Sequence, residues 1–428
     1  MPRILPERRT RVDVAVTAVI VIGVLIATFA IWYASPARHT VDAQAVTPPP
    51  PVASAPGVPT GFRVAWQAKS AATDIPALAR STVVTADGGT VSGRDPLSGA
   101  VLWHYDRTLP LCTAAPAWPD SSNEVLAVYR NSRGCSEVTA LDAASGARRS
   151  ARTSDADQTL RLSTESGYVL AFGPSRLETW GSNLVRGIEY GRISAPVNPG
   201  VTPERTGCTL FSGAISGERV AVIEHCTNDR GYRLTVLGAI LDSDEKVQQY
   251  GSSFITDTTS GPPPRLVAMT ASAIAVYDGG SGTPATSTPT LRQFDSNGAP
   301  TTSNAVEGMP SAPPDSIALT DDGLVSFFTG RSTVVLDGST LHPVYQVPGA
   351  LGPGETMAGQ LLLPVAGGIS VRDPATGREI RTIAVTREPG QDSAHGHDHA
   401  QGTVSLRVLG DHVVEQQGSI ITTLAPVH

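Results

Sequence analysis

The stretch VSGRDPLSGAVLWHY, residues 91–105, places an Asp and a Gly between two runs of strand-forming residues. At the end of the first run, Asp95 can accept hydrogen bonds from the backbone N–H groups of a turn. Gly99 can supply the positive φ that such a turn needs. Trp103, eight residues after Asp95, can pack its ring between neighbouring sheets. The stretch therefore predicts two antiparallel strands joined by a tight turn.

The same phrase recurs along the chain. Strong copies are VTALDAASGARRS, with Asp142 and Gly146, and ISVRDPATGREIRTI, with Asp373 and Gly377. Weaker copies surround Asp295 and Asp337, and the stretches around Asp242 and, in degenerate form, Trp180 fit more loosely. Apart from a long interval around that degenerate copy, successive Asp positions lie 36 (Asp337 to Asp373) to 53 (Asp242 to Asp295) residues apart. This range brackets the period of about 40–50 residues that is typical of four-stranded propeller blades.

The two ends of the repeat region complete each other. The C-terminal segment 406–425 supplies strands but no outer strand, and FRVAWQA at 62–68 is a strand without a unit of its own. Joining them makes an eighth blade and closes the ring, which removes the exposed sheet edges. We therefore predict an all-β, eight-bladed β-propeller over residues 61–428, with seven blades as the alternative. The 42 Gly and 34 Pro, with only 17% charged residues, suit such a turn-rich fold.

An apolar segment precedes the repeats. Residues 14–33, VAVTAVIVIGVLIATFAIWY, carry no charge and are long enough to span the roughly 30 Å hydrocarbon core of a bilayer. Four arginines precede the segment and one follows it closely: Arg3, Arg8, Arg9, Arg11 and then Arg38. The positive-inside rule predicts that residues 1–13 are cytoplasmic and that the propeller lies outside the cytoplasmic membrane. The alternative is a signal peptide cleaved near Val41-Asp42-Ala43, but such peptides have apolar regions of only about 7–15 residues.

Residues 34–60 are rich in Pro and Ala and contain four consecutive prolines, Pro48 to Pro51. Such a composition cannot form a core and favours extended polyproline II. We expect a semi-rigid stalk that could hold the propeller as far as ~75 Å from the bilayer. A proline-motif ligand is the alternative interpretation.

Four cysteines lie in the region expected outside the cytoplasm. Cys112 and Cys135 are 23 residues apart, and Cys208 and Cys226 are 18 apart. Each spacing fits two strands of one blade, so two structural disulfides are expected. A zinc site is the alternative, although the CxxC spacing is absent.

The tract QDSAHGHDHAQ, residues 391–401, is the strongest candidate for a metal. His395, His397 and His399 alternate around Asp398, and imidazoles suit Zn, Cu or Ni. A solvated loop between blades is the alternative, because Gly396 and the polar neighbours provide no rigid support for ligands.

The D-P-x-[ST]-G-x-x-x-W phrase resembles the blade motif of quinoprotein-like (PQQ-like) β-propellers, and the anchor with its stalk resembles the membrane-anchored versions found in actinobacteria. The Trp is kept only at Trp103, because Ser150 and Arg381 occupy the matching places in the other strong copies. Dehydrogenases of that superfold hold pyrroloquinoline quinone and Ca²⁺ at the axis, with adjacent cysteines and a stacking Trp in one branch. This chain has no adjacent cysteines, so no cofactor is expected.

These features together predict a non-catalytic scaffold in the cell envelope, attached to the membrane by one helix and binding an envelope protein. A quinone-dependent dehydrogenase is the first alternative, and a metal sensor using the His395–His399 tract is the second. The net charge of −7 argues against a nucleic-acid partner.

Overall fold

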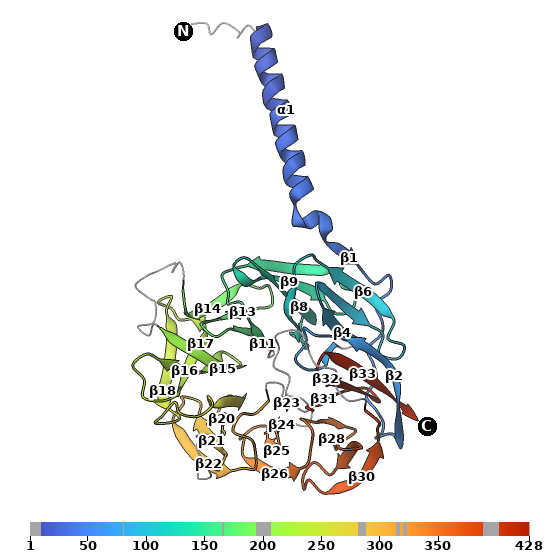
Figure 1. The fold of residues 1–428 in the computed structure, drawn as a ribbon, viewed down its shortest axis with the longest axis vertical. Coiled ribbons are helices and arrows are strands. Elements are labelled where there is room, and N and C mark those ends of the chain that lie inside the picture. The colour runs from blue at the N-terminus through green and yellow to red at the C-terminus, as the bar shows by residue number, and fades with distance from the viewer. Residues whose placement is uncertain are drawn as a thin grey trace.

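The computed structural model describes residues 10–79, 81–164, 167–193, 207–280, 288–313, 317–319, 323–387 and 402–427. Apart from one N-terminal helix and a short 3₁₀ turn, the described elements are strands, and they form eight antiparallel sheets. The sheets are arranged as blades around a central axis (Figure 1). The predicted eight-bladed propeller is confirmed, and the seven-bladed alternative is excluded.

The first four blades follow one another along the chain, each with its innermost strand first. Blade 1 contains β3 (Ala77–Ala79), β4 (Thr82–Asp87), β5 (Thr90–Arg94) and β6 (Val101–Asp106). Blade 2 contains β7 (Leu111–Ala117), β8 (Glu124–Asn131), β9 (Gly134–Asp142) and β10 (Arg148–Thr153). Blade 3 contains β11 (Arg161–Thr164), β12 (Val169–Phe172), β13 (Arg176–Trp180) and β14 (Arg186–Gly191). Blade 4 contains β15 (Cys208–Ser216), β16 (Arg219–Cys226), β17 (Arg233–Leu241) and β18 (Val247–Phe254).

The next three blades repeat this order, and the last one does not. Blade 5 contains β19 (Arg265–Met269), β20 (Ala273–Asp278), β21 (Thr290–Asp295) and β22 (Pro300–Ala305). Blade 6 contains β23 (Ile317–Leu319), β24 (Leu324–Phe328), β25 (Ser332–Asp337) and β26 (Pro343–Pro348). Blade 7 contains β27 (Glu355–Met357), β28 (Gln360–Val365), β29 (Gly368–Arg372) and β30 (Glu379–Ala384). Blade 8 contains β31 (Ser405–Leu409), β32 (His412–Gln417), β33 (Ile420–Val427) and, outermost, β2 (Gly61–Lys69).

Blade 8 closes the ring with strands from both ends of the repeat region. β2 pairs antiparallel with β33, from Gly61 opposite Val427 to Lys69 opposite Ile420. This pairing is the closure predicted from the sequence. It removes two open sheet edges, which would otherwise expose unpaired backbone groups.

The core lies between neighbouring blades. The middle strands are almost completely buried because a blade covers each of their faces, so they are continuous apolar runs such as Val125–Tyr129 in β8. One apolar cluster joins Val84 and Val91 of blade 1 to Ala127 and Leu141 of blade 2. Outer strands such as β10 instead alternate between exposed and partly covered residues.

Helix α1 (Arg11–Ala34) precedes the propeller and lies outside the ring (Figure 1). Thr10 caps its N-terminus in a reciprocal arrangement with Asp13. At 24 residues it is about 36 Å long, and its composition and length suit a membrane span. It contains the whole of the predicted segment 14–33.

The segment between α1 and β2 differs from the expected free stalk. After a 3₁₀ turn, η1 (Pro36–His39), strand β1 (Val41–Ala43) pairs with the outer edge of blade 1 at β6. Ala45 N–H then donates to Ser145 O of blade 2 over 2.9 Å. A Cβ at Gly410 of blade 8 would lie 2.5 Å from Val52, which shows how closely the segment packs there.

We call residues 41–60 the strap. Its apolar Ala55 and Val58 pack on the blade 7–blade 8 cluster, which explains why a proline-rich segment can leave solvent. Only residues 35–40 separate α1 from β1, so blade 1 lies within about 25 Å of the helix end.

Candidate functional site

The strand order gives the ring two different faces. Connections from the innermost strand to the second, and from the third to the outermost, meet at one end of the axis, which we call the turn face. Connections from the second strand to the third, and from one blade to the next, meet at the opposite end, the loop face. The predicted Asp–Gly motif belongs to the turn face.

The three strong copies of the motif form the same turn. Asp95 Oδ1 accepts hydrogen bonds from the backbone N–H groups of Leu97 and Ser98, at 3.0 and 2.8 Å, and from the Ser98 hydroxyl. Asp142 and Asp373 accept equivalent bonds. Side-chain and backbone hydrogen bonds from Thr376 lower the pKa of Asp373. The motif aspartates therefore stabilise their own turns.

The glycines of these turns face an aromatic ring of the preceding blade. Gly146 has φ 76°, and a Cβ there would lie 2.8 Å from the Trp103 ring. Trp103 Nε1–H donates to Ala143 O over 3.0 Å in the same turn. Trp66 and Tyr345 make the corresponding contacts with the turns of Gly99 and Gly377. Burial raises the pKa of Tyr345 to about 12, so its hydroxyl remains a donor.

Arginines take this place where the aromatic residue is missing. Blade 2 has Ser150 at the aromatic position, and its contact with the next blade is made by Arg152 instead. The Arg152 guanidinium donates to Leu184 O in the blade 3 turn over 2.8 Å. Blade 8 has no such turn, because the ring closes there. Arg381 of blade 7 instead donates to the Val58 and Pro59 carbonyls of the strap, both at 2.8 Å. The motif residues are structural, and none of them forms a reactive cluster on the turn face.

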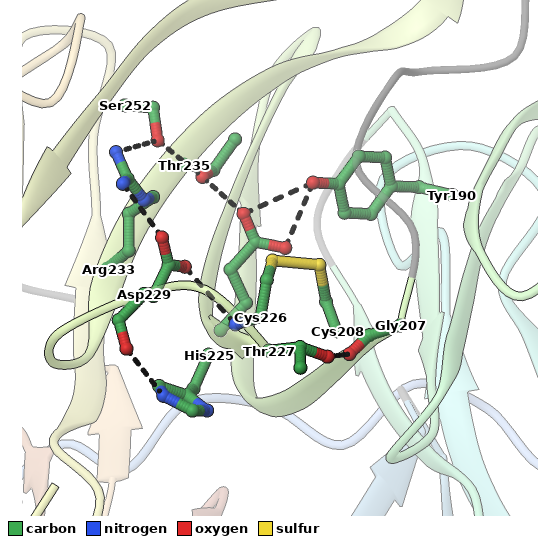
Figure 2. Close-up of a disulfide and its surroundings, with 11 residues drawn as sticks. Tyr190, Gly207, Cys208, His225, Cys226, Thr227, Asp229, Arg233, Thr235 and Ser252 are labelled. Carbon is green, nitrogen blue, oxygen red and sulfur yellow. Dashed lines mark hydrogen bonds and ion pairs between the residues drawn. A yellow bond between two sulfur atoms is a disulfide. The ribbon is translucent and has the colours of Figure 1, made fainter.

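The four cysteines form the two pairs expected from their spacing. The Cys112–Cys135 disulfide joins β7 to β9. The Cys208–Cys226 disulfide joins β15 to β16 (Figure 2). Each pair lies within one blade. Among the described residues there is no free cysteine.

Glu224 lies beside the second disulfide and is completely buried. Its carboxylate accepts hydrogen bonds from the Tyr190 hydroxyl, at 2.9 and 3.1 Å, and from Thr235 at 2.6 Å. With Cys208 and Cys226 it is the one close group of three potential metal ligands in the described part of the chain. Both sulfurs are bonded to each other, so neither is a thiolate that could bind zinc.

The other metal candidate cannot be placed. His395, His397, Asp398 and His399 lie outside the residues that the structure describes. Their tract belongs to the connection 385–404 between blades 7 and 8, which starts and ends at the loop face.

The loop face carries all the long connections. Between the described strands, five connections have ten or more residues, and all five join strand ends at this face: 192–207, 255–264, 279–289, 306–316 and 385–404. No turn-face connection between those strands exceeds six residues. Because these long connections differ in length and sequence from blade to blade and gather at one end of a rigid ring, this face is the candidate binding surface.

A cavity of about 450 Å³ lies among the innermost strands, and it extends from the loop-face connections along the axis to Thr164 and Met269, the last residues of β11 and β19. Arg161 and Arg265, the first residues of β11 and β19, line it together with Arg407 of β31. Asp74 is the one acidic residue among the lining residues. Apolar walls come from residues that include Phe172, Phe211, Pro263, Pro264 and Leu266. The volume and the mixed lining are typical of a ligand site.

These three arginines were not singled out by sequence reasoning. One sequence feature could have indicated two of them, because the innermost strands of blade 3 and blade 5 both begin with Arg-Leu. It could be used only once the blades were aligned, and the innermost strands carry no part of the Asp–Gly motif.

No protein-family model matches the chain, and no curated protein matches it. Several solved structures are similar in shape. The computationally designed protein Ika8 matches with a TM-score of 0.51 at 14% identity, covering 88% of this chain and 99% of that chain. Saccharomyces cerevisiae Sqt1 matches with a TM-score of 0.51 at 8% identity, covering 87% and 100%. Dihydro-heme d1 dehydrogenase NirN has a TM-score of 0.48 at 14% identity, covering 82% and 78%. Identities this low describe the fold alone.

Proposed function

We propose that this chain is a non-catalytic binding scaffold, anchored in the cytoplasmic membrane by α1, whose propeller holds an envelope protein through its loop face. The observation that supports this proposal best is the asymmetry of the ring. One face is built from short, repeated turns and is partly covered by the strap, whereas every long connection between described strands leaves from the other face. Surfaces of this kind, with variable loops on a rigid support, commonly bind partners.

The proposed location outside the cytoplasm rests on two further observations. Two disulfides lie within the propeller, and such bonds persist in oxidising compartments. Arginines are concentrated before α1, which favours an N-terminus inside the cell. In this arrangement residues 35–40 would place blade 1 close to the outer surface of the membrane.

Site-specific photocrosslinking in native membranes tests the proposal. A photoreactive amino acid is placed at Ser311, which is exposed on the loop face beside the cavity, or at Leu97, which is 62% exposed on the turn face. We expect one abundant protein adduct from position 311 and none from position 97. Identical adducts from both positions, or none from either, would contradict a loop-face scaffold. Recovery of a bound redox cofactor from the purified protein would contradict the non-catalytic role.

A further inference from the structure

The central cavity concentrates positive charge in a protein whose net charge is −7. Its three arginines come from blades 3, 5 and 8, so they reach the axis from separated parts of the ring. Arg407 Nε lies 2.8 Å from Glu355 Oε2, and that carboxylate is almost completely buried. Glu355 therefore neutralises part of this charge and fixes the orientation of Arg407.

Arg161 differs from Arg407 in its surroundings. In the part of the chain that the structure describes, its guanidinium has no ion pair with a carboxylate. The residue is nevertheless only partly exposed, because it starts β11 inside the ring. A partly desolvated guanidinium interacts more strongly with an anion than a fully hydrated one. Its planar donors match a carboxylate in a bidentate geometry.

The walls of the cavity restrict what kind of anion fits. Phe172 is the last residue of β12 and pairs with Arg161 in the antiparallel register of β11 and β12. Phe211 comes from the adjacent blade 4 and also lines the cavity. Both rings already pack in part against blade 4, with Phe211 edge-on to Tyr232, but an inorganic anion would bury none of the apolar surface that they still present to the cavity. A carboxylate that carries apolar groups would satisfy both the charge and the walls.

We propose that the cavity binds an acidic peptide segment of the partner protein, in which a Glu or Asp carboxylate contacts Arg161 and neighbouring apolar side chains pack on Phe172 and Phe211. This inference rests on the proposed scaffold function, and it specifies the chemistry that the loop face recognises. A peptide is favoured over a free small acid because the cavity opens among the long connections 255–264 and 306–316, which supply Pro263, Pro264 and Ser311 to its lining.

Fluorescence anisotropy with the full-length protein in detergent tests this directly. The probe is a labelled, amidated peptide of alternating Phe and Glu, and the reference probe replaces each Glu with Gln. Arg161→Gln removes the charge, Arg161→Lys keeps the charge without the planar donors, and Arg63→Gln removes a matched charge from the exposed outer strand β2. Melting temperatures of the three variants establish that each is folded. Phenylacetate and phenylacetamide, tested as competitors, represent a small acid and its neutral counterpart.

We expect the Glu peptide to bind and the Gln peptide to bind at least tenfold more weakly. Arg161→Gln should weaken binding of the Glu peptide by about tenfold or more, since a charge-assisted hydrogen bond contributes at least that factor. Arg161→Lys should give an intermediate loss, and Arg63→Gln should change affinity less than twofold. Equal binding of the two peptides, no binding, or no effect of Arg161→Gln would overturn the proposal. Binding of phenylacetate without binding of the peptide would overturn its peptide part.

Photocrosslinking from position 311 in the Arg161→Gln background separates this inference from the scaffold function. A partner adduct that persists while the peptide result is negative contradicts the acidic-segment inference alone. If the protein without the Arg161→Gln change gives no adduct from position 311, the result contradicts the scaffold function itself.

Discussion

The turn face and the loop face of this propeller are made from the same eight sheets, yet they follow different rules. On the turn face, Asp95, Asp142 and Asp373 form nearly identical turns. An aromatic side chain of the preceding blade packs on each of these turns. On the loop face, the connections vary from two residues to twenty between the described strands. The comparison indicates that the repeated motif encodes blade docking, and it is the reason why the proposed binding surface is placed where the repeat is absent.

A glycine substitution on the turn face should give the largest effect. Gly146→Ala places a Cβ 2.8 Å from the Trp103 ring at φ 76°. The left-handed backbone costs roughly 1–2 kcal/mol for an L-residue, and overpacking adds about 1–3 kcal/mol. The measurement is the free energy of unfolding of the detergent-solubilised protein in denaturant.

Gly217→Ala is the matched control for that variant. Gly217 also has a positive φ, 56°, and lies on the turn face, but nothing lies within 4 Å of its ideal Cβ. It should therefore lose only the backbone contribution of roughly 1–2 kcal/mol. If both variants are destabilised equally, ring-on-turn packing does not explain the motif.

The strap provides a smaller test, at the one junction where the turn is missing. Arg381→Ala removes two hydrogen bonds to the Val58 and Pro59 carbonyls, which should cost roughly 1–2 kcal/mol. Hydrogen exchange should become faster in a peptide covering residues 52–60 but not in one covering β1, because β1 is held separately by β6.

Arg378→Ala is the control, because Arg378 is exposed in the turn of the same blade. It removes an equal charge without a contact to the strap carbonyls. Unchanged exchange at residues 52–60 in Arg381→Ala would show that the strap is held by its apolar contacts alone.

The sequence predicted the ring well because its information is local and repeated. Blade number and closure follow from three features: the Asp–Gly turn, the aromatic side chain eight residues after the Asp, and the unpaired strand at 62–68. The strap was not predictable in this way, since residues 34–60 have the composition of a spacer, and their contacts depend on an edge at β6 and a missing turn that exist only in the closed ring. The cavity arginines were missed for a related reason. Arg161, Arg265 and Arg407 are far apart in sequence and meet only at the axis.

Acidification should affect the turn face by the smallest amount, and with a definite sign. The folded state lowers the pKa of Asp373 from its usual value of 3.8, through hydrogen bonds from Thr376. Its contribution to stability is therefore complete above that usual value and is lost as the pH falls through the lower folded pKa. Asp373→Asn should slightly destabilise the protein at neutral pH and reduce the fall in melting temperature below pH 4.

Asp257→Asn is the control for the acid response, since that carboxylate lies in the loop-face connection 255–264 and pairs with Arg230 at the surface. We expect the fall in melting temperature below pH 4 to be closer to that of the unmodified protein in Asp257→Asn than in Asp373→Asn. An exposed pair of this kind is worth little and is screened by salt, whereas the pKa of Asp373 is lowered mainly by short, local hydrogen bonds from Thr376 and only to a smaller extent by the charge of Arg378. Repeating the two titrations in high salt would therefore separate the faces. The Asp373 difference should persist, and any Asp257 difference should disappear. The opposite result would mean that acid stability resides in the loops, and the division between a structural face and a binding face would not hold for the carboxylates.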